Sequence, residues 1–67
     1  MTNKEILQGW FTKNFRDAWR GTFPDIDERC DVLIRNADEV SPNIINGDAT
    51  TFAALKSASF FLTREKK

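Results

Sequence analysis

The sequence predicts an all-α fold, a compact three-helix domain that takes up residues 1–67. Two observations favour this fold class. The central segment carries apolar residues at alternating spacings of four and three, the pattern of one buried helix face: Ile26, Cys30, Leu33, Ala37 and Val40. The segments on either side also carry apolar residues at helical spacing, and Gly- and Pro-containing connectors separate the three. A chain of 67 residues has room for a single domain.

The first helix is expected over Thr2–Arg20. Thr2 and Glu5 have the spacing of a capping box, in which the hydroxyl and the carboxylate satisfy free backbone N–H groups at a helix start. The apolar residues that follow occupy an arc of about 220° on a helical wheel, which is wider than one packing interface of a small bundle needs. The residues at the edges of this arc, Ile6 and Trp19, are therefore expected to remain for another surface.

The second helix is expected over Asp25–Val40. Asp25 is the predicted N-cap, with Glu28 three residues later as in a capping box. Val32 points away from the apolar stripe and has no predicted structural role. The side opposite the stripe is strongly acidic through five residues: Asp27, Glu28, Asp31, Asp38 and Glu39.

The third helix is expected over Ala49–Arg64, with Asp48 or Thr50 as its cap. Pro42 breaks the preceding helix and Asn46–Gly47 is a turn signal, so the two isoleucines between them can fold under the bundle.

One aromatic residue of the third helix, Phe60, falls on its outward face, although a strand over residues 58–62 stays open as an alternative. The predicted core consists of Leu7, Phe11, Phe15, Ala18, Ile26, Cys30, Leu33, Ala37, Phe52, Leu55, Ala58 and Leu62.

The chain lacks the residues that most catalytic and metal sites use. It has no histidine and one cysteine, so a disulfide within the chain and a zinc site are both excluded. Cys30 lies on the apolar stripe, where a thiol is normally inert. Carboxylate pairs such as Asp27 and Asp31 lie on an exposed face without the burial that acid–base catalysis needs. We expect no enzymatic activity, no cofactor, no metal and no small-molecule substrate.

The expected location follows from the hydropathy pattern and from the single cysteine. No apolar run approaches the roughly 18 residues that span a bilayer, and the N-terminus leads straight into an amphipathic pattern. A lone cysteine on a buried stripe is typical of a reducing compartment. A cytoplasmic location without membrane contact is therefore expected.

The net charge is zero, but the charge is unevenly distributed along the chain. Residues 1–24 carry four basic and two acidic side chains, residues 25–48 carry seven acids and two arginines, and residues 49–67 carry four basic groups and one acid. A basic–acidic–basic chain of this kind can neutralise much of itself when its segments pack together.

The leading interpretation is a non-catalytic interaction module that binds a larger protein partner or a second copy of itself. Aromatic side chains and Arg anchor interfaces more often than most other residues, and the chain holds two Trp and six Phe. The predicted contact residues are Trp19 and Phe60, together with the neighbouring cations Arg16 and Arg20.

The acidic line of the second helix is a predicted second protein-binding site, formed by Asp27, Asp31 and Asp38. Regularly placed carboxylates on a rigid helix can imitate nucleic-acid phosphates and occupy a basic channel on another protein. Some small inhibitors of nucleic-acid enzymes, including phage-encoded ones, work in this way. A very short, aromatic-rich chain is typical of the accessory or inhibitor proteins of phages and mobile elements. The protein is therefore expected to be an interaction module that could belong to this class.

The alternative interpretation is a small helical nucleic-acid-binding protein, because three short helices are also the skeleton of helix-turn-helix proteins. Lys13, Arg16 and Arg20 can grip phosphates, and Trp19 can stack on a base. Against this, zero net charge gives no general attraction to a polyanion. The connection between the second and third predicted helices is also longer than the three or four residues of that motif.

Overall fold

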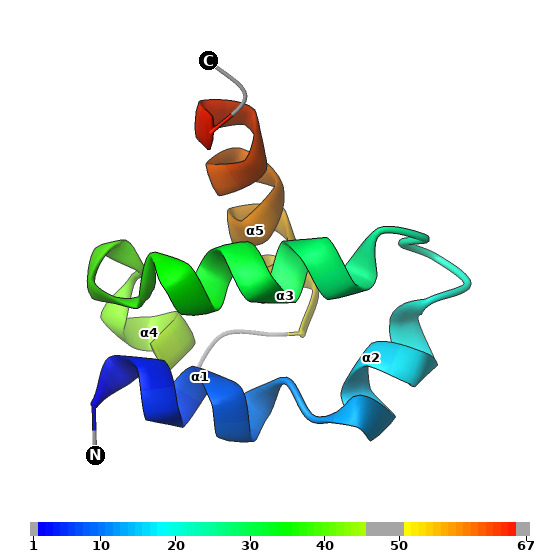
Figure 1. Cartoon of the computed structure of the whole chain (residues 1–67), viewed down its shortest axis with the longest axis horizontal. Coiled ribbons are helices and arrows are strands. Elements are labelled where there is room, and N and C mark those ends of the chain that lie inside the picture. The colour runs from blue at the N-terminus through cyan, green and yellow to red at the C-terminus, as the bar shows by residue number, and fades with distance from the viewer. Residues whose placement is uncertain (1, 46–50, 66–67) are drawn as a thin grey trace.

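The regular structure described for this chain is helical throughout, which confirms the all-α fold class. The computed structural model describes residues 2–45 and 51–65. Within these residues it contains five α-helices and one 3₁₀ turn, so the predicted three-helix count is wrong. In chain order (Figure 1) the elements are α1 (Asn3–Trp10), α2 (Lys13–Trp19), α3 (Ile26–Arg35), η1 (Ala37–Glu39), α4 (Pro42–Ile45) and α5 (Thr51–Glu65).

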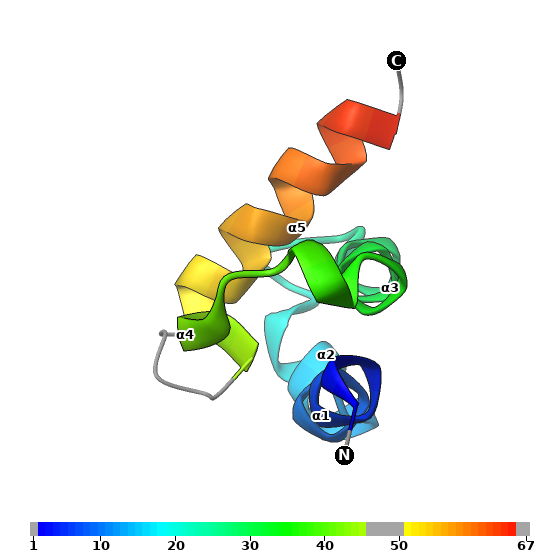
Figure 2. The same ribbon diagram turned by 90° about the vertical axis from the view of Figure 1, so that its left-hand side faces the viewer.

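The central element of the arrangement is α3. α1 and α2 follow each other along one side of α3, which runs back in the opposite direction, and α5 crosses α3 at a steep angle (Figure 1). Figure 2 looks nearly along the axes of α1 and α3 and shows α5 passing obliquely beside α3. The most extensive contact of α3 is with α5, and α3 also packs against α1 and α2. A helix in this position must bury more than one of its faces.

A break at Thr12 divides the predicted first helix into α1 and α2. The capping box at the start of α1 is confirmed, because Thr2 Oγ1 accepts from the Glu5 N–H at 3.2 Å and the Glu5 carboxylate accepts from the Thr2 N–H at 3.1 Å. The Thr12 hydroxyl accepts from the Phe15 N–H at 3.3 Å and caps α2. A side chain that satisfies a free backbone donor offers the chain an alternative to continuing a helix. A single helix over Thr2–Arg20 is therefore wrong.

The predicted second helix, Asp25–Val40, is longer than the observed one because α3 ends at Arg35. Asn36 leaves the helical conformation, its side-chain amide donates to the carbonyl one turn earlier at 2.9 Å, and the chain continues as η1. Asp25 is the N-cap residue of α3, as predicted, but the predicted capping interaction is wrong. Its side chain makes no capping hydrogen bond, and its carboxylate accepts instead from Arg29 Nε at 2.8 Å.

The buried core draws on α1, α3, η1, α4 and α5, whereas α2 contributes only partly buried side chains. Two residues predicted for the core are exposed instead, Ala18 and Phe52, and Phe15 is half-buried. The break before α2 changes the register of its apolar side relative to α1, and this explains Ala18. Among the residues whose burial the structure describes, the buried apolar ones are Leu7, Phe11, Ile26, Cys30, Val32, Leu33, Ala37, Val40, Ile44, Ile45, Ala54, Leu55, Ala58, Phe61 and Leu62.

Val32 is fully buried although it points away from the apolar stripe of α3. The stripe describes one contact face, but α3 has neighbours on more than one side. Val32 supplies apolar surface beyond the stripe, which a helix at the centre of a small core requires.

The last part of the chain follows the predicted outline. Pro42 starts α4 at its first position, where its missing N–H costs no hydrogen bond, and Ile44 and Ile45 are buried beneath the helices as expected. α5 remains helical across residues 58–62, so the strand alternative is wrong. The predicted turn at Asn46–Gly47 and the predicted start of the third helix at residues 48–50 lie outside the described residues.

Candidate functional site

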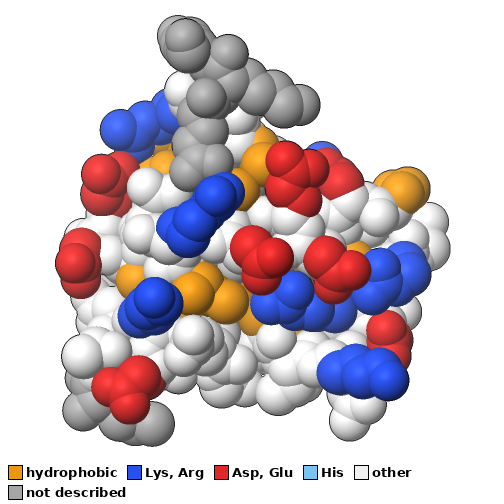
Figure 3. Space-filling view, in the orientation of Figure 1, with side chains coloured by type: hydrophobic (Ala, Val, Ile, Leu, Met, Phe, Trp, Pro, Cys, Tyr) orange, Lys and Arg blue, Asp and Glu red, His pale blue; other side chains and the backbone are white. Residues whose placement is uncertain are grey.

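Arg16 of α2 and Arg20, the residue directly after this helix, bind two aspartates of α3. Arg16 donates through Nη2 to Asp31 at 3.0 Å and through Nη1 to Asp27 at 3.4 Å, and its Nε donates to the Phe11 carbonyl at 3.2 Å. Arg20 Nη1 donates to the other oxygen of Asp27 at 3.0 Å. Figure 3 shows red and blue side chains in contact across this face of the molecule. This arginine–aspartate cluster joins the predicted basic contact group to the predicted acidic line.

The cluster favours the ionised forms of Asp27, Arg16 and Arg20. A hydrogen bond from Arg20, and a further one from Arg16, keep the pKa of Asp27 below its ordinary value. Partial burial acts to lower the pKa of Arg16, but its pairing with the Asp31 carboxylate prevails and the pKa is raised. The basic and acidic segments of the sequence thus neutralise each other at this contact. Partner binding by these four residues stays a prediction.

The Asp27→Asn variant is expected to lose less stability than wild type when the solution is acidified. A carboxylate with a depressed folded-state pKa stabilises the fold above its ordinary pKa of 3.8, and this contribution disappears as the pH falls through the folded-state value. The variant is expected to be less stable at neutral pH and to lose less stability on acidification to about pH 3. Urea unfolding midpoints at the two pH values measure the difference. Equal losses in both proteins would contradict the pairing.

The third member of the predicted acidic line, Asp38, is separated from the other two. Because α3 ends before it, Asp38 lies on η1, where it is exposed and borders a small hollow with Pro42 and Ile45. Its neighbour Glu39 forms an ion pair of 2.8 Å with Arg64 of α5. The three aspartates therefore do not form a continuous row on one rigid helix.

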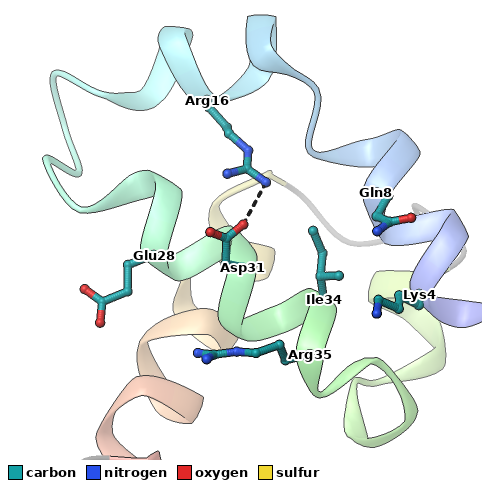
Figure 4. Close-up of a pocket in the computed structure, with 7 residues that line it drawn as sticks. All are labelled: Lys4, Gln8, Arg16, Glu28, Asp31, Ile34 and Arg35. Atoms are coloured by element: carbon teal, nitrogen blue, oxygen red, sulfur yellow. Dashed lines mark hydrogen bonds and ion pairs between the residues drawn. The ribbon is translucent and has the colours of Figure 1, made fainter.

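An open, polar hollow of about 760 Å³ lies between α1, α2 and α3. Figure 4 shows the residues that line it: Lys4, Gln8, Arg16, Glu28, Asp31, Ile34 and Arg35. Asp31 is bound by Arg16, and Glu28 points away from the α1 residues, so these two carboxylates do not converge on one point. Among the described residues, no three His, Cys, Asp or Glu side chains are placed to hold a metal ion. The hollow offers no arrangement for acid–base chemistry.

Cys30 is fully buried in the core. Burial raises the pKa of its thiol to about 11, despite the nearby Arg16. The thiol is therefore protonated at neutral pH, and a protonated, inaccessible thiol is a poor nucleophile.

An aromatic path runs from α2 to the start of α5. The Trp19 and Phe23 rings lie 6.0 Å apart between centroids, and the Phe23 and Phe52 rings lie 6.5 Å apart. Arg29 covers Phe23 with its guanidinium 4.8 Å from the ring centroid. Trp19, predicted to be left at the edge of the first helix, is half-buried in this path and packs against the core.

The outward side of α5 carries alternating rings and cations. Phe52, Lys56, Phe60 and Arg64 follow each other at intervals of four, and residues so spaced are neighbours on a helix surface. Lys56 Nζ lies 5.2 Å from the Phe52 ring centroid, and the Arg64 guanidinium lies 5.8 Å from that of Phe60. Phe52 and Phe60 are 50% and 61% exposed, the large apolar side chains most exposed among the described residues. We call these four residues the α5 ridge.

The α5 ridge overlaps the predicted contact residues only at Phe60. The sequence analysis predicted that Phe52 belongs to the core. It therefore missed that α5 exposes two Phe rings, Phe52 and Phe60. The signal that identifies the ridge is present in the sequence as the spacing of rings and cations at every fourth residue. Figure 2 shows one side of α5 free of the other helices.

Comparison of the chain with models of protein families, with curated proteins and with solved structures finds no match. Over the parts of the chain that the structure describes, no helix combines the length and the apolar character needed to cross a bilayer. The geometry of the surfaces is therefore the basis for inferring a function.

Proposed function

We propose that this domain is a non-catalytic interaction module that occupies or bridges a surface of a larger protein through the α5 ridge. The observation that carries the proposal is the exposure of Phe52 and Phe60 on a helix whose inner side is already filled. The inner side of α5 buries Ala54, Leu55, Ala58, Phe61 and Leu62. Phe52 touches Phe23 and Phe60 touches Phe61, but at least half of each exposed residue stays open to a partner.

Exposed rings of this kind suit an interface. A buried Phe contributes about 1.5–3 kcal/mol of hydrophobic free energy that an exposed Phe does not gain. Aromatic residues and Arg are enriched where partners make their strongest contacts, whereas Lys is depleted there. Phe52, Phe60 and Arg64 therefore form the expected anchors, with Lys56 as a cation between the two rings at the rim of the contact.

The interface has to extend beyond the ridge. A stable protein–protein interface covers about 800 Å² on each partner, which is more than four side chains supply. Phe23 is in ring contact with Phe52, and Trp19 is in ring contact with Phe23, so these two residues are the nearest aromatic continuation. This extension includes Trp19 among the proposed contacts, in line with the sequence prediction.

The alternative function, nucleic-acid binding, has less support. Two of the three cations expected to grip phosphates, Arg16 and Arg20, are bound to aspartates of the same chain. Releasing them for a polyanion would leave Asp27 and Asp31 facing the phosphates without compensation. The acidic line supports a phosphate-mimicking role less for the same reason, because two of its members already bind arginines.

The Phe52→Ala/Phe60→Ala double variant tests the proposal. Immobilised wild-type domain is used to capture proteins from cells that express it naturally, and each captured protein is purified and titrated against wild type and variant. We expect the double variant to bind at least about thirtyfold more weakly, as for the loss of an interface anchor. Its unfolding free energy should stay within about 0.5 kcal/mol of wild type, as for exposed side chains.

Lys13→Ala serves as the control, because Lys13 is exposed on α2 and lies outside the ridge. It should leave both binding and stability unchanged. A partner that binds the double variant as tightly as wild type would overturn the proposal, and so would unfolding of the double variant. Trp19→Ala is a less selective probe, since Trp19 also packs against the core.

A further inference from the structure

We infer that the partner presents an apolar groove with carboxylates along its rim; this inference rests on the proposed function of the α5 ridge. Among the side chains of α5 that the structure describes as exposed, two are charged, Lys56 and Arg64, and both are positive. Each cation lies over a Phe ring of the ridge. A surface that covers these rings must also receive the two cations, and carboxylates do so at the lowest cost in desolvation.

The spacing of the ridge defines the shape of this groove. Phe52 and Phe60 are eight residues apart, which corresponds to about 12 Å along a helix axis. Lys56 and Arg64 have the same separation and are offset by about one turn, or 6 Å. A helix that presents apolar anchors along one line inserts into a groove of its partner. The groove therefore needs two apolar pockets about 12 Å apart, with one acidic group between them for Lys56 and one beyond the Phe60 pocket for Arg64.

Arg64 is held in place for this role. Its Nη1 donates to Glu39 at 2.8 Å, and its guanidinium lies 5.8 Å from the Phe60 ring centroid and 5.5 Å from that of Phe61. The Glu39 carboxylate and the Arg64 side chain are each 53% exposed. A partner carboxylate can therefore approach the exposed part of the Arg64 guanidinium while Glu39 keeps its bond to Nη1.

The charges of the α5 ridge disfavour three other binding partners: a second copy of the domain, a nucleic acid and an anionic membrane. In an antiparallel pair of ridges, Phe52 would face Phe60 of a second copy, but Lys56 would face Lys56, and like charges in contact are destabilising. The affinity of a protein for a nucleic acid rises roughly with the number of phosphates that its cations neutralise. The ridge offers two cations on a domain of zero net charge, and these neutralise few phosphates. An anionic membrane attracts each cation near its surface only weakly, and lipid-binding sites use clusters of about four to eight cations where the ridge has two.

A peptide-display selection tests the inference. Random peptides of about 12 residues, long enough to span the ridge as a helix, are panned on the immobilised domain, and the Phe52→Ala/Phe60→Ala variant removes non-specific binders. We expect the enriched peptides to combine Asp and Glu with large apolar residues. Synthetic copies should bind Lys56→Glu/Arg64→Glu about tenfold more weakly than wild type. Lys4→Glu/Lys13→Glu, which reverses two exposed cations outside the ridge and so matches the change in charge, should bind as wild type.

The outcomes separate this inference from the proposed function. Enriched peptides that are neutral or basic, with binding still dependent on the two rings, would overturn the acidic groove and leave the interaction module standing. Peptide enrichment that is the same on wild type and on the ring-deleted variant would overturn the interaction module itself. Tighter ring-dependent binding to oligo(dT) or to phosphatidylcholine–phosphatidylglycerol vesicles, or a ring-dependent dimer in sedimentation, would overturn the inference in favour of that occupant.

Discussion

Leu33→Ala is expected to leave a large fraction of the domain unfolded at 37 °C. Leu33 has no exposed surface and lies on α3, the helix that contacts α1, α2 and α5. Replacing a fully buried Leu by Ala typically costs about 2–5 kcal/mol, because the transfer free energy is lost and a cavity remains. A domain of this length has a total stability of roughly 3–10 kcal/mol. The loss is therefore comparable with the whole stability of the fold.

Urea unfolding followed by helical circular dichroism measures this loss. Phe60→Ala is the matched control, since it removes a larger side chain of the same apolar class from an exposed position. Phe60→Ala should shift the unfolding free energy by less than about 0.5 kcal/mol. A Leu33→Ala midpoint equal to that of Phe60→Ala would mean that α3 is not the centre of the core.

Arg16→Ala is expected to destabilise the domain by about 1–2 kcal/mol, more than an exposed salt bridge usually contributes. The Arg16 side chain is 20% exposed and donates to the Phe11 carbonyl, to Asp27 and to Asp31. These three bonds join the break after α1 to α3. Their loss leaves a backbone carbonyl and two carboxylates without this donor, and hydrogen bonds to charged groups are worth more than neutral ones.

Two control variants separate charge from geometry at this position. Arg16→Lys keeps the charge but cannot reach three acceptors with a planar group, and we expect it to recover less than half of the loss. Lys13→Ala removes an exposed cation of the same helix and should leave the unfolding free energy unchanged. If Arg16→Ala and Lys13→Ala unfold at the same urea concentration, the arginine–aspartate cluster does not stabilise the fold.

The helical class and much of the core followed from local patterns. The stripe on α3 is buried from Ile26 to Val40 as its spacing indicates, even though the helix itself ends at Arg35. Burial of the stripe depends on the spacing of its side chains, and the 3₁₀ turn η1 keeps Ala37 and Val40 on the buried side. The helix ends were predicted less well. At Thr12 and Asn36 a side-chain hydrogen bond competes with continuation of the helix, and a periodic pattern does not reveal which of the two prevails.

The candidate surface was predicted only in part. The outward position of Phe60 followed from its place on the helical wheel and is confirmed by its 61% exposure. Phe52 was misplaced because it lies at the edge of the apolar arc of α5, where the neighbouring elements decide between burial and exposure. The pairing of Arg16 and Arg20 with Asp27 and Asp31 joins residues from different helices, and charge counting alone could not assign those partners.

The sequence by itself determined the helical class, the capping box at Thr2, the buried stripe, the lack of histidine and the single cysteine. Each of these depends on residue type and on spacing within one segment. Only the tertiary structure decided that Val32 is core and Phe52 is surface, and that the basic and acidic segments bind each other. The physical reason is that burial and ion pairing are set by what packs against a side chain, and those neighbours come from elsewhere in the chain.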